Sequence, residues 1–301
     1  MKMESNHLSI NGLFADSGKG IKILVSFLSI LLCSATFSAL GYIVMKMFND
    51  PVLSKKWLQL LSAFGTFVCA PCLASVLIFH NWKEALSLHT TKIIFIGLAL
   101  ISIVSSMPFI NYITQMNAQM HLPDCLKGVE DMMRTMEDQN GELTKEFLSV
   151  DSFGGFLLNI IVLALIPAVG EELLFRGFLQ KCIEKISGNI HIGIWVAAIL
   201  FSAIHCQFYG FFPRMIMGAL FGYFLYWSDS IFVPMICHFF NNSIIVVCYY
   251  FMQDQVDSLE NLGNENLWGC LCSLFFVLLF CETMRRFSSS YKENISISDS
   301  K

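Results

Sequence analysis

The stretch AVGEELLFRGFL, residues 168–179, places two adjacent carboxylates and an arginine inside an otherwise apolar run. Ionisable groups at membrane depth are costly unless they pair or face a polar cavity, so they indicate a functional site. On a helix, Glu172 and Arg176 share one face, while Glu171 is turned away by about 100°. We therefore expect Arg176 to hold Glu172 and to leave Glu171 free to act.

The composition is that of a membrane protein. The 301 residues are 55% hydrophobic and only 14% charged, with a mean hydropathy of +0.61, whereas soluble domains carry about 25% charged residues. The formal net charge is -4 and no basic cluster is present, which excludes the electrostatic footprint of a nucleic-acid-binding protein. Most of the eleven cysteines lie in apolar runs, so no disulfide framework is indicated.

Apolar runs of about 20 residues, enough to span a bilayer, recur along the chain. They predict an all-α, polytopic membrane helix bundle of about eight transmembrane helices, with a catalytic cavity inside the bilayer. The expected spans are roughly 21–48, 57–80, 92–115, 153–182, 191–210, 212–227, 231–251 and 267–284. Helix breakers at 49–51, 187–189 and Pro213 separate spans, whereas Pro167 lies inside one and is expected to kink it next to the acidic pair.

No internal repeat or linker separates a second domain, so we expect one membrane domain with three regions. Residues 1–150 hold the N-terminal transmembrane helices and an acidic extracytoplasmic loop. Residues 151–251 form the catalytic core. Residues 252–301 form the last transmembrane helix and a cytoplasmic tail.

Loop charges predict the orientation. The connection 116–151 has three basic against eight acidic residues, and 252–266 is also acidic, whereas 83–92, 181–190 and the C-terminal region carry lysine or arginine. Because basic loops stay in the cytoplasm, both termini are expected there. We expect a multi-pass protein of the bacterial plasma membrane, with the endoplasmic reticulum as an alternative. Lys55 and Lys56 disagree with this orientation. Residues 126–138 have helical spacing and predict a solvated helix rather than an interfacial one.

Two more polar clusters lie inside expected spans: FSAIH, residues 201–205, and HFFNN, residues 238–242. At about 1.5 Å per residue, Glu171 lies roughly 18 Å, His205 roughly 21 Å and His238 roughly 10 Å from one end of its span. These depths predict a single cavity in the middle to cytoplasmic half of the bilayer. His238 and Asn242 share a helical face and so point to the same place.

This set of side chains is suited to peptide hydrolysis. A water must lose a proton before it attacks a carbonyl, and a carboxylate in apolar surroundings is a competent general base. We assign that role to Glu171, assisted by His205. His238 and Asn242 would donate to the oxyanion of the tetrahedral intermediate, while Arg176 neutralises Glu172. Each group also has a structural alternative, because an intramembrane histidine or asparagine often only joins two helices.

Together, EExxxR at 171–176, FxxxH at 201–205 and HxxxN at 238–242 resemble the three ordered motifs of the CAAX protease and bacteriocin-processing family of intramembrane proteases, which includes the type II CAAX prenyl endopeptidases. The resemblance covers about residues 153–250. It implies a membrane-embedded endopeptidase acting on a membrane-associated peptide or protein, plain or lipidated. It also implies that Glu171 and His205 activate water, and that His238 and Asn242 stabilise the oxyanion.

Members of this family are often called metalloproteases, and a glutamate with two histidines can ligate zinc. However, HExxH is absent, and an amide is a poor zinc ligand but a good oxyanion donor. We therefore expect a glutamate protease that requires no cofactor, with zinc as the alternative.

Two other classes of function compete with the enzyme. One is a non-catalytic immunity or adaptor protein of the same fold, which would not need the complete set of Glu, His, His and Asn. The other is a proton-coupled transporter, in which Glu171, His205 and His238 would form a relay. A transporter predicts inverted repeats, and the sequence has none that is convincing.

Overall fold

The computed structural model describes residues 10–252 and 267–299, and every regular element within these ranges is a helix. This confirms the all-α membrane bundle. Seven helices in the described ranges are long and apolar enough to cross a membrane, by length and composition. They are Lys19–Met45, Pro51–Ile78, Ile93–Ala118, Phe153–Ser187, Phe208–Ser228, Phe232–Phe251 and Leu267–Tyr291. The helix expected fifth is present but shorter, at Ile190–Ala203.

The elements follow the expected order along the chain. The first half contains α1 (Lys19–Met45), α2 (Pro51–Ala63), η1 (Phe64–Cys69), α3 (Ala70–Ile78), α4 (Trp82–Ala85), α5 (Ile93–Ala118), η2 (Asp124–Leu126) and α6 (Lys127–Leu148). The second half contains α7 (Phe153–Asn159), η3 (Ile160–Leu165), α8 (Ile166–Glu172), η4 (Leu173–Gln180), α9 (Lys181–Ser187), α10 (Ile190–Ala203), η5 (Phe208–Gly210), α11 (Phe211–Ser228), α12 (Phe232–Phe251) and α14 (Leu267–Asp299).

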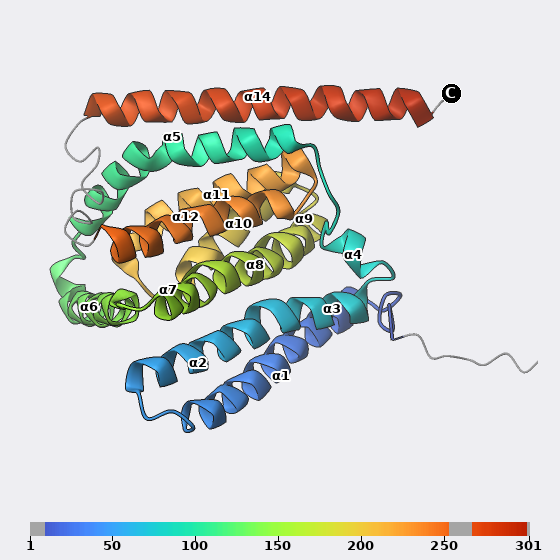
Figure 1. Ribbon diagram of the computed structural model, residues 1–301. Helices are drawn as coiled ribbons and strands as arrows, with labels where there is room; N and C mark the ends of the chain where they lie inside the picture. Colours follow the sequence, from blue (N-terminus) through green and yellow to red (C-terminus); the bar gives the residue numbers. More distant parts are fainter. Residues whose placement is uncertain (1–9, 253–266, 300–301) are drawn as a thin grey trace, which may run out of the picture.

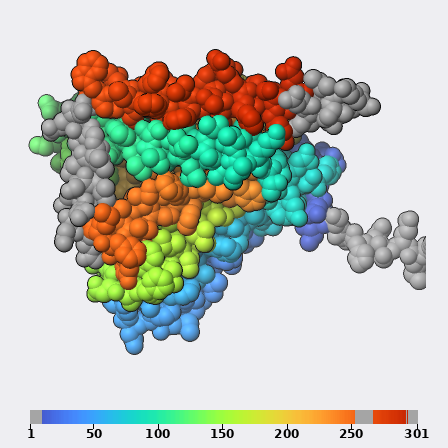
Figure 2. All heavy atoms as spheres, turned by 45° about the horizontal axis from the view of Figure 1, so that its top comes forward, coloured from blue at the N-terminus to red at the C-terminus, as the bar shows by residue number. Residues whose placement is uncertain are grey.

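The long helices run roughly parallel to one another and form layers (Figure 1). Helices α14 and α5 lie side by side and form one outer layer, which Figure 2 shows from another direction. Helices α10, α11 and α12 and the α7–α9 span make up the middle, and the hairpin of α1 with α2–α3 packs against it on the other side. Helix α6 lies at one end of the bundle, and α4 and α9 lie at the other.

Helices begin and end at two of the breakers that the sequence predicts. The side chain of Asp50 accepts hydrogen bonds from the backbone N–H groups of Val52 and Leu53 and caps α2, which begins at Pro51. At the second breaker, Gly188 takes a left-handed conformation with φ of 70° and ends α9. Asn189 then caps α10. Asp50, Gly188 and Asn189 thus adopt the capping and turn conformations that their residue types favour locally.

Pro167 lies between two π-helical segments, η3 before it and η4 after it. Proline cannot donate a backbone hydrogen bond, so the helix around it departs from regular α-geometry. The carbonyl oxygen of Leu163, four residues earlier, accepts a hydrogen bond from the Asn242 side chain at 3.4 Å. The irregularity expected beside the acidic pair is therefore present, and a backbone acceptor there is bonded to α12.

The acidic connection contains the 22-residue helix α6. Lys55, which disagreed with the predicted orientation, forms an ion pair with Glu146 of α6 at 2.8 Å. Its neighbour Lys56 is buried and donates to the carbonyl of Phe147 at 2.8 Å. These lysines therefore fasten the end of α6 to α2. The acidic segment 252–266 lies almost wholly outside the described residues, and the chain after the last span continues as helix α14 to Asp299.

Candidate active site

Glu172 is the centre of a buried polar cluster. Its Oε1 lies 2.8 Å from Nη1 of Arg176 and 2.8 Å from Nδ1 of His238. Glu172 is 0% exposed and Arg176 is 1% exposed. The guanidinium of Arg176 also donates to the carbonyl of Gly218 at 3.2 Å and lies 4.4 Å from the ring centroid of Phe201. The expected pairing of Arg176 with Glu172 is present, and it joins the α7–α9 span to α11 and α12.

Glu171 faces a different environment from its neighbour. Its side chain is 13% exposed and lines a cavity. Its Oε2 lies 3.8 Å from Nε2 of His238, and no ion pair with an arginine or lysine is found for it in the part of the chain that the structure describes. Two adjacent carboxylates thus occupy distinct sites, one fixed by partners and one turned to the cavity, as their 100° separation on a helix predicts.

His205 also lines the cavity, but it does not lie inside a helix as the sequence predicted. Helix α10 ends at Ala203, and the chain turns, with Cys206 in the left-handed region at φ of 52°. Nδ1 of His205 lies 2.8 Å from the carbonyl of Phe201. Because a carbonyl can only accept, Nδ1 carries the proton, and Nε2 of the neutral ring is a proton acceptor.

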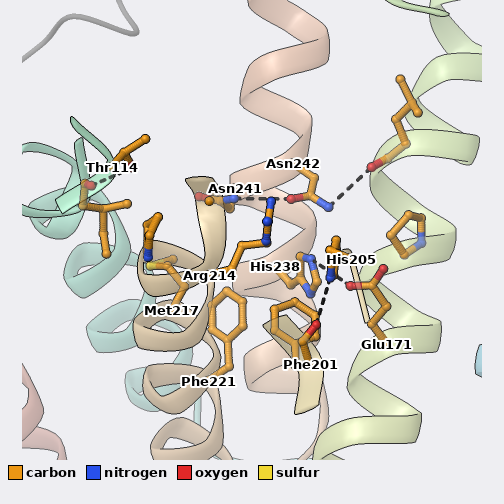
Figure 3. A pocket seen from close by; sticks show the side chains of 15 residues that line it. Thr114, Glu171, Phe201, His205, Arg214, Met217, Phe221, His238, Asn241 and Asn242 are labelled. Atoms are coloured by element: carbon orange, nitrogen blue, oxygen red, sulfur yellow. Dashed lines mark hydrogen bonds and ion pairs between the residues drawn. The ribbon is translucent and has the colours of Figure 1, made fainter. Parts of the chain in front are cut away.

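Asn242 reaches the cavity from α12. Its Nδ2 donates to Leu163 O, and its Oδ1 accepts from Nδ2 of Asn241 at 3.3 Å. These bonds orient the carboxamide (Figure 3). They also show that Asn242 joins two helices, which is the structural role considered for it in the sequence.

The cavity has a volume of about 460 Å³, within the range of roughly 300–1,000 Å³ for small-ligand pockets. It is lined by Ile110, Thr114, Leu163, Pro167, Glu171, Phe201, His205, Gly210, Pro213, Arg214, Met217, Phe221, His238, Asn241 and Asn242. Glu171 lies near the middle of its span and His238 lies in the first half of α12, as expected. However, Thr114 and Arg214 lie near the ends of their helices that adjoin α6, so the cavity extends toward α6 and not toward α4. The half of the bilayer in which the cavity lies stays a prediction.

Sequence reasoning missed Arg214 and Gln207. Arg214 lies in the first turn of α11 and donates from Nη1 to Oε1 of Gln207 at 2.9 Å and from Nη2 to the carbonyl of Gln207 at 2.6 Å. An isolated charge near the start of an apolar helix was a usable signal, because such a residue is expected to face the bundle interior or a polar cavity.

Glu171, His205 and His238 are the side chains that could ligate zinc. His238 Nδ1 is bonded to Glu172 and His205 Nδ1 to a backbone carbonyl, a pattern that leaves Nε2 of each ring as the nitrogen that could bind a metal. Within residues 10–252 and 267–299, no three His, Cys, Asp or Glu side chains are grouped closely enough to hold a metal ion. Glu171, His205 and His238 are therefore not grouped closely enough to serve together as the ligands of a metal ion.

Two comparisons relate this chain to known proteins. The sequence pattern of the family described as "Type II CAAX prenyl endopeptidase Rce1-like" matches residues 153–244, which include all three motifs. A relative from Bacillus subtilis (strain 168), described as the uncharacterized protein YpbD, is 30% identical over 139 residues, which are 42% of this chain and 67% of the relative. No solved structure matches the chain.

Proposed function

Because the chain belongs to the Rce1-like family of type II CAAX prenyl endopeptidases, we propose that it is an intramembrane endopeptidase in which Glu171 is the general base. One observation carries the assignment. Glu172 is fully buried and bonded to Arg176 and His238, whereas the adjacent Glu171 lines the cavity. A carboxylate that accepts a proton in catalysis must be accessible to water and free of a permanent ion pair.

The reaction begins with a water between Glu171 and the scissile carbonyl. Glu171 removes a proton as the water oxygen attacks the carbonyl carbon, and a tetrahedral intermediate with a negatively charged oxygen forms. The proton is then delivered to the leaving amine as the C–N bond breaks. His205 assists from the turn after α10, since the lone pair on Nε2 of its neutral ring can accept a hydrogen bond from the water.

Asn242 and His238 are our candidates for stabilising the oxyanion. The Asn242 amide has two N–H groups, of which one is used by Leu163 O, so the other can serve a substrate oxygen. His238 must donate from Nε2, and because its Nδ1 already donates to Glu172, the ring must be doubly protonated to do so. The carboxylate of Glu172, bonded to Nδ1, is the counter-charge of that ring. The proposed mechanism requires no metal.

Cleavage of a peptide panel tests the proposal. Purified protein in detergent would be given membrane-associated peptides, prenylated and plain, and products would be identified by mass spectrometry. We expect the parent to cleave at least one peptide, and Glu171→Gln, His205→Ala and His238→Ala to lose that activity. A chelator is expected to have no effect. Glu142→Gln is the matched control, because Glu142 is an exposed carboxylate on α6.

Two outcomes would change the assignment. Loss of activity with chelator and recovery with zinc would move the enzyme to the metalloproteases. If the parent cleaves nothing while Glu171→Gln still alters a cellular phenotype, the chain is better described as a non-catalytic binding protein of this fold.

A further inference from the structure

Arg214 is a charged cavity residue that lies outside the three motifs. It lines the same cavity as Glu171 and His205 (Figure 3). A guanidinium remains protonated in proteins, and a charge at membrane depth is strongly unfavourable unless something compensates it. The proposed hydrolysis gives Arg214 no task.

Arg214 forms no direct ion pair in the described part of the chain, and the carboxylates that interact with its charge, Glu137 and Glu171, lie beyond ion-pair distance. Its two Nη atoms donate to oxygens of Gln207, which are neutral. None of the ion pairs in the described part of the chain includes Arg214, and its buried Nε has no hydrogen-bond partner among the described residues. The buried Arg176, by contrast, has Glu172 at 2.8 Å.

The guanidinium is nevertheless held in place. A Cβ atom built on Gly210 would lie 2.7 Å from Nη1 and 2.9 Å from Cζ of Arg214, so the group packs directly against the Gly210 backbone. Gln207 holds it from the turn that precedes η5. A guanidinium that is held in place without a direct ion pair can bind a carboxylate through two parallel hydrogen bonds.

We propose that Arg214 binds a carboxylate of the peptide substrate and thereby selects peptides with a negative charge near the cleaved bond. This inference rests on the proposed function. Arg214 and Glu171 line one cavity of about 460 Å³, so a short peptide segment can contact both. An arginine presents five N–H donors, and those not used by Gln207 can donate to a carboxylate. The carboxylate comes either from a free C-terminus or from an acidic side chain.

Matched peptides separate these two sources. The peptide cleaved best by the parent would be made as a C-terminal acid, as a C-terminal amide, and with each acidic side chain replaced by its amide. We expect one of these neutralisations to raise KM about ten- to a hundredfold in the parent, the range for a lost hydrogen bond between charged groups. In Arg214→Gln, KM for the charged peptide should rise by the same factor, so that the charged and neutral peptides have equal KM values. Arg214→Lys should restore part of the preference.

Two further variants act as controls. Gly210→Ala keeps the charge of Arg214 but displaces its guanidinium, so it should also reduce the preference for a carboxylate. Arg286→Gln removes an exposed arginine of α14 and should leave the preference unchanged. The inference is overturned if the parent cleaves charged and neutral peptides equally, or if Arg214→Gln lowers kcat for both by one factor and leaves their ratio unaltered.

A binding measurement separates this inference from the proposed function. Glu171→Gln protein would be titrated with a fluorescent apolar tripeptide as its free acid, as its C-terminal amide, and as an amide with one aspartate. Tighter binding of a charged form, lost in the double variant with Arg214→Gln, supports the role of Arg214 even if the parent cleaves nothing. Equal or absent binding of all three forms overturns it, whether or not the parent is a protease.

Discussion

Nδ1 of His238 on α12 lies 2.8 Å from Oε1 of Glu172 on α8, and the same oxygen lies 2.8 Å from Arg176. One carboxylate of the acidic pair therefore neutralises an arginine and orients a histidine. Because a carboxylate only accepts, this bond also fixes which ring nitrogen of His238 carries a proton. The neighbouring Glu171 takes no part in these bonds. Glu172 therefore has a structural role, whereas Glu171 is the proposed general base.

Replacement by alanine should mainly affect stability at Glu172 and mainly affect peptide cleavage at Glu171. Glu172→Ala leaves Arg176 buried without a counter-charge, which costs about 3–5 kcal/mol of stability. Glu171→Ala removes a carboxylate with no arginine or lysine partner in the described chain, so stability should stay within about 1 kcal/mol of the parent while peptide cleavage is lost. Unfolding midpoints in detergent, read beside cleavage rates, check both. Equal loss of stability in the two variants would contradict this division of roles.

Asn242 and Pro167 should be coupled through Leu163. Asn242→Ala removes a proposed oxyanion donor and should lower kcat about 10²–10³-fold. Pro167→Ala supplies a backbone N–H that can compete with Asn242 for Leu163 O, so it should also lower kcat while leaving stability equal or higher. The double variant should be no slower than Asn242→Ala alone. Multiplied effects in the double variant would show that Pro167 and Asn242 act independently.

Helix α6 should stay attached down to low pH. The Arg134 guanidinium, the Leu122 N–H and His121 hydrogen-bond to Glu130 and hold the pKa of its carboxyl at about 2, below its usual 4.5. A lowered pKa stabilises the fold fully above the unfolded value, and that contribution is lost as pH falls through the folded value. The difference in unfolding midpoint between the parent and Glu130→Gln should therefore be constant from pH 8 to about 5 and shrink between about 4.5 and 2. A difference that already shrinks above pH 5 would contradict this assignment to Glu130.

Local sequence signals predicted most of the fold because the elements depend on them. Apolar length gave the spans, and Asp50 and Gly188 form the caps and turns that their side chains favour. The pairing of Glu172 with Arg176 follows from helical spacing alone. Such features need no knowledge of how distant segments pack.

The remaining features depend on contacts between distant segments. Helix α10 ends before His205, and a turn leads from it to α11. The Ser202 hydroxyl of α10 donates to the carbonyl of Phe211 across this turn, a contact that the sequence of one span does not predict. The bond of Asn242 to Leu163 joins residues 79 positions apart. Arg214 was overlooked because its importance depends on the cavity that α5, α8, α10 and α12 enclose around it.

The orientation in the membrane is the prediction with most consequence for the substrate. Lys83, Lys181 and Lys185 lie at the α4 and α9 end of the bundle, whereas the cavity extends toward the acidic helix α6. If basic ends stay in the cytoplasm, the substrate enters from the other side. A membrane-impermeant maleimide should then label Cys125, which is exposed at the α6 end, in intact cells. It should label a Lys185→Cys variant at α9 only after permeabilisation.

Cys272 gives an internal control for that experiment, because it is exposed on an apolar span and should face lipid. Labelled peptides would be identified by mass spectrometry, so the other native cysteines need not be removed. The reverse pattern, with Lys185→Cys labelled in intact cells and Cys125 protected, would place the cavity opening on the cytoplasmic side. It would also show that the acidic loop is cytoplasmic, opposite to the orientation that the basic ends predict. Candidate substrates would then have to be sought among cytoplasmic proteins.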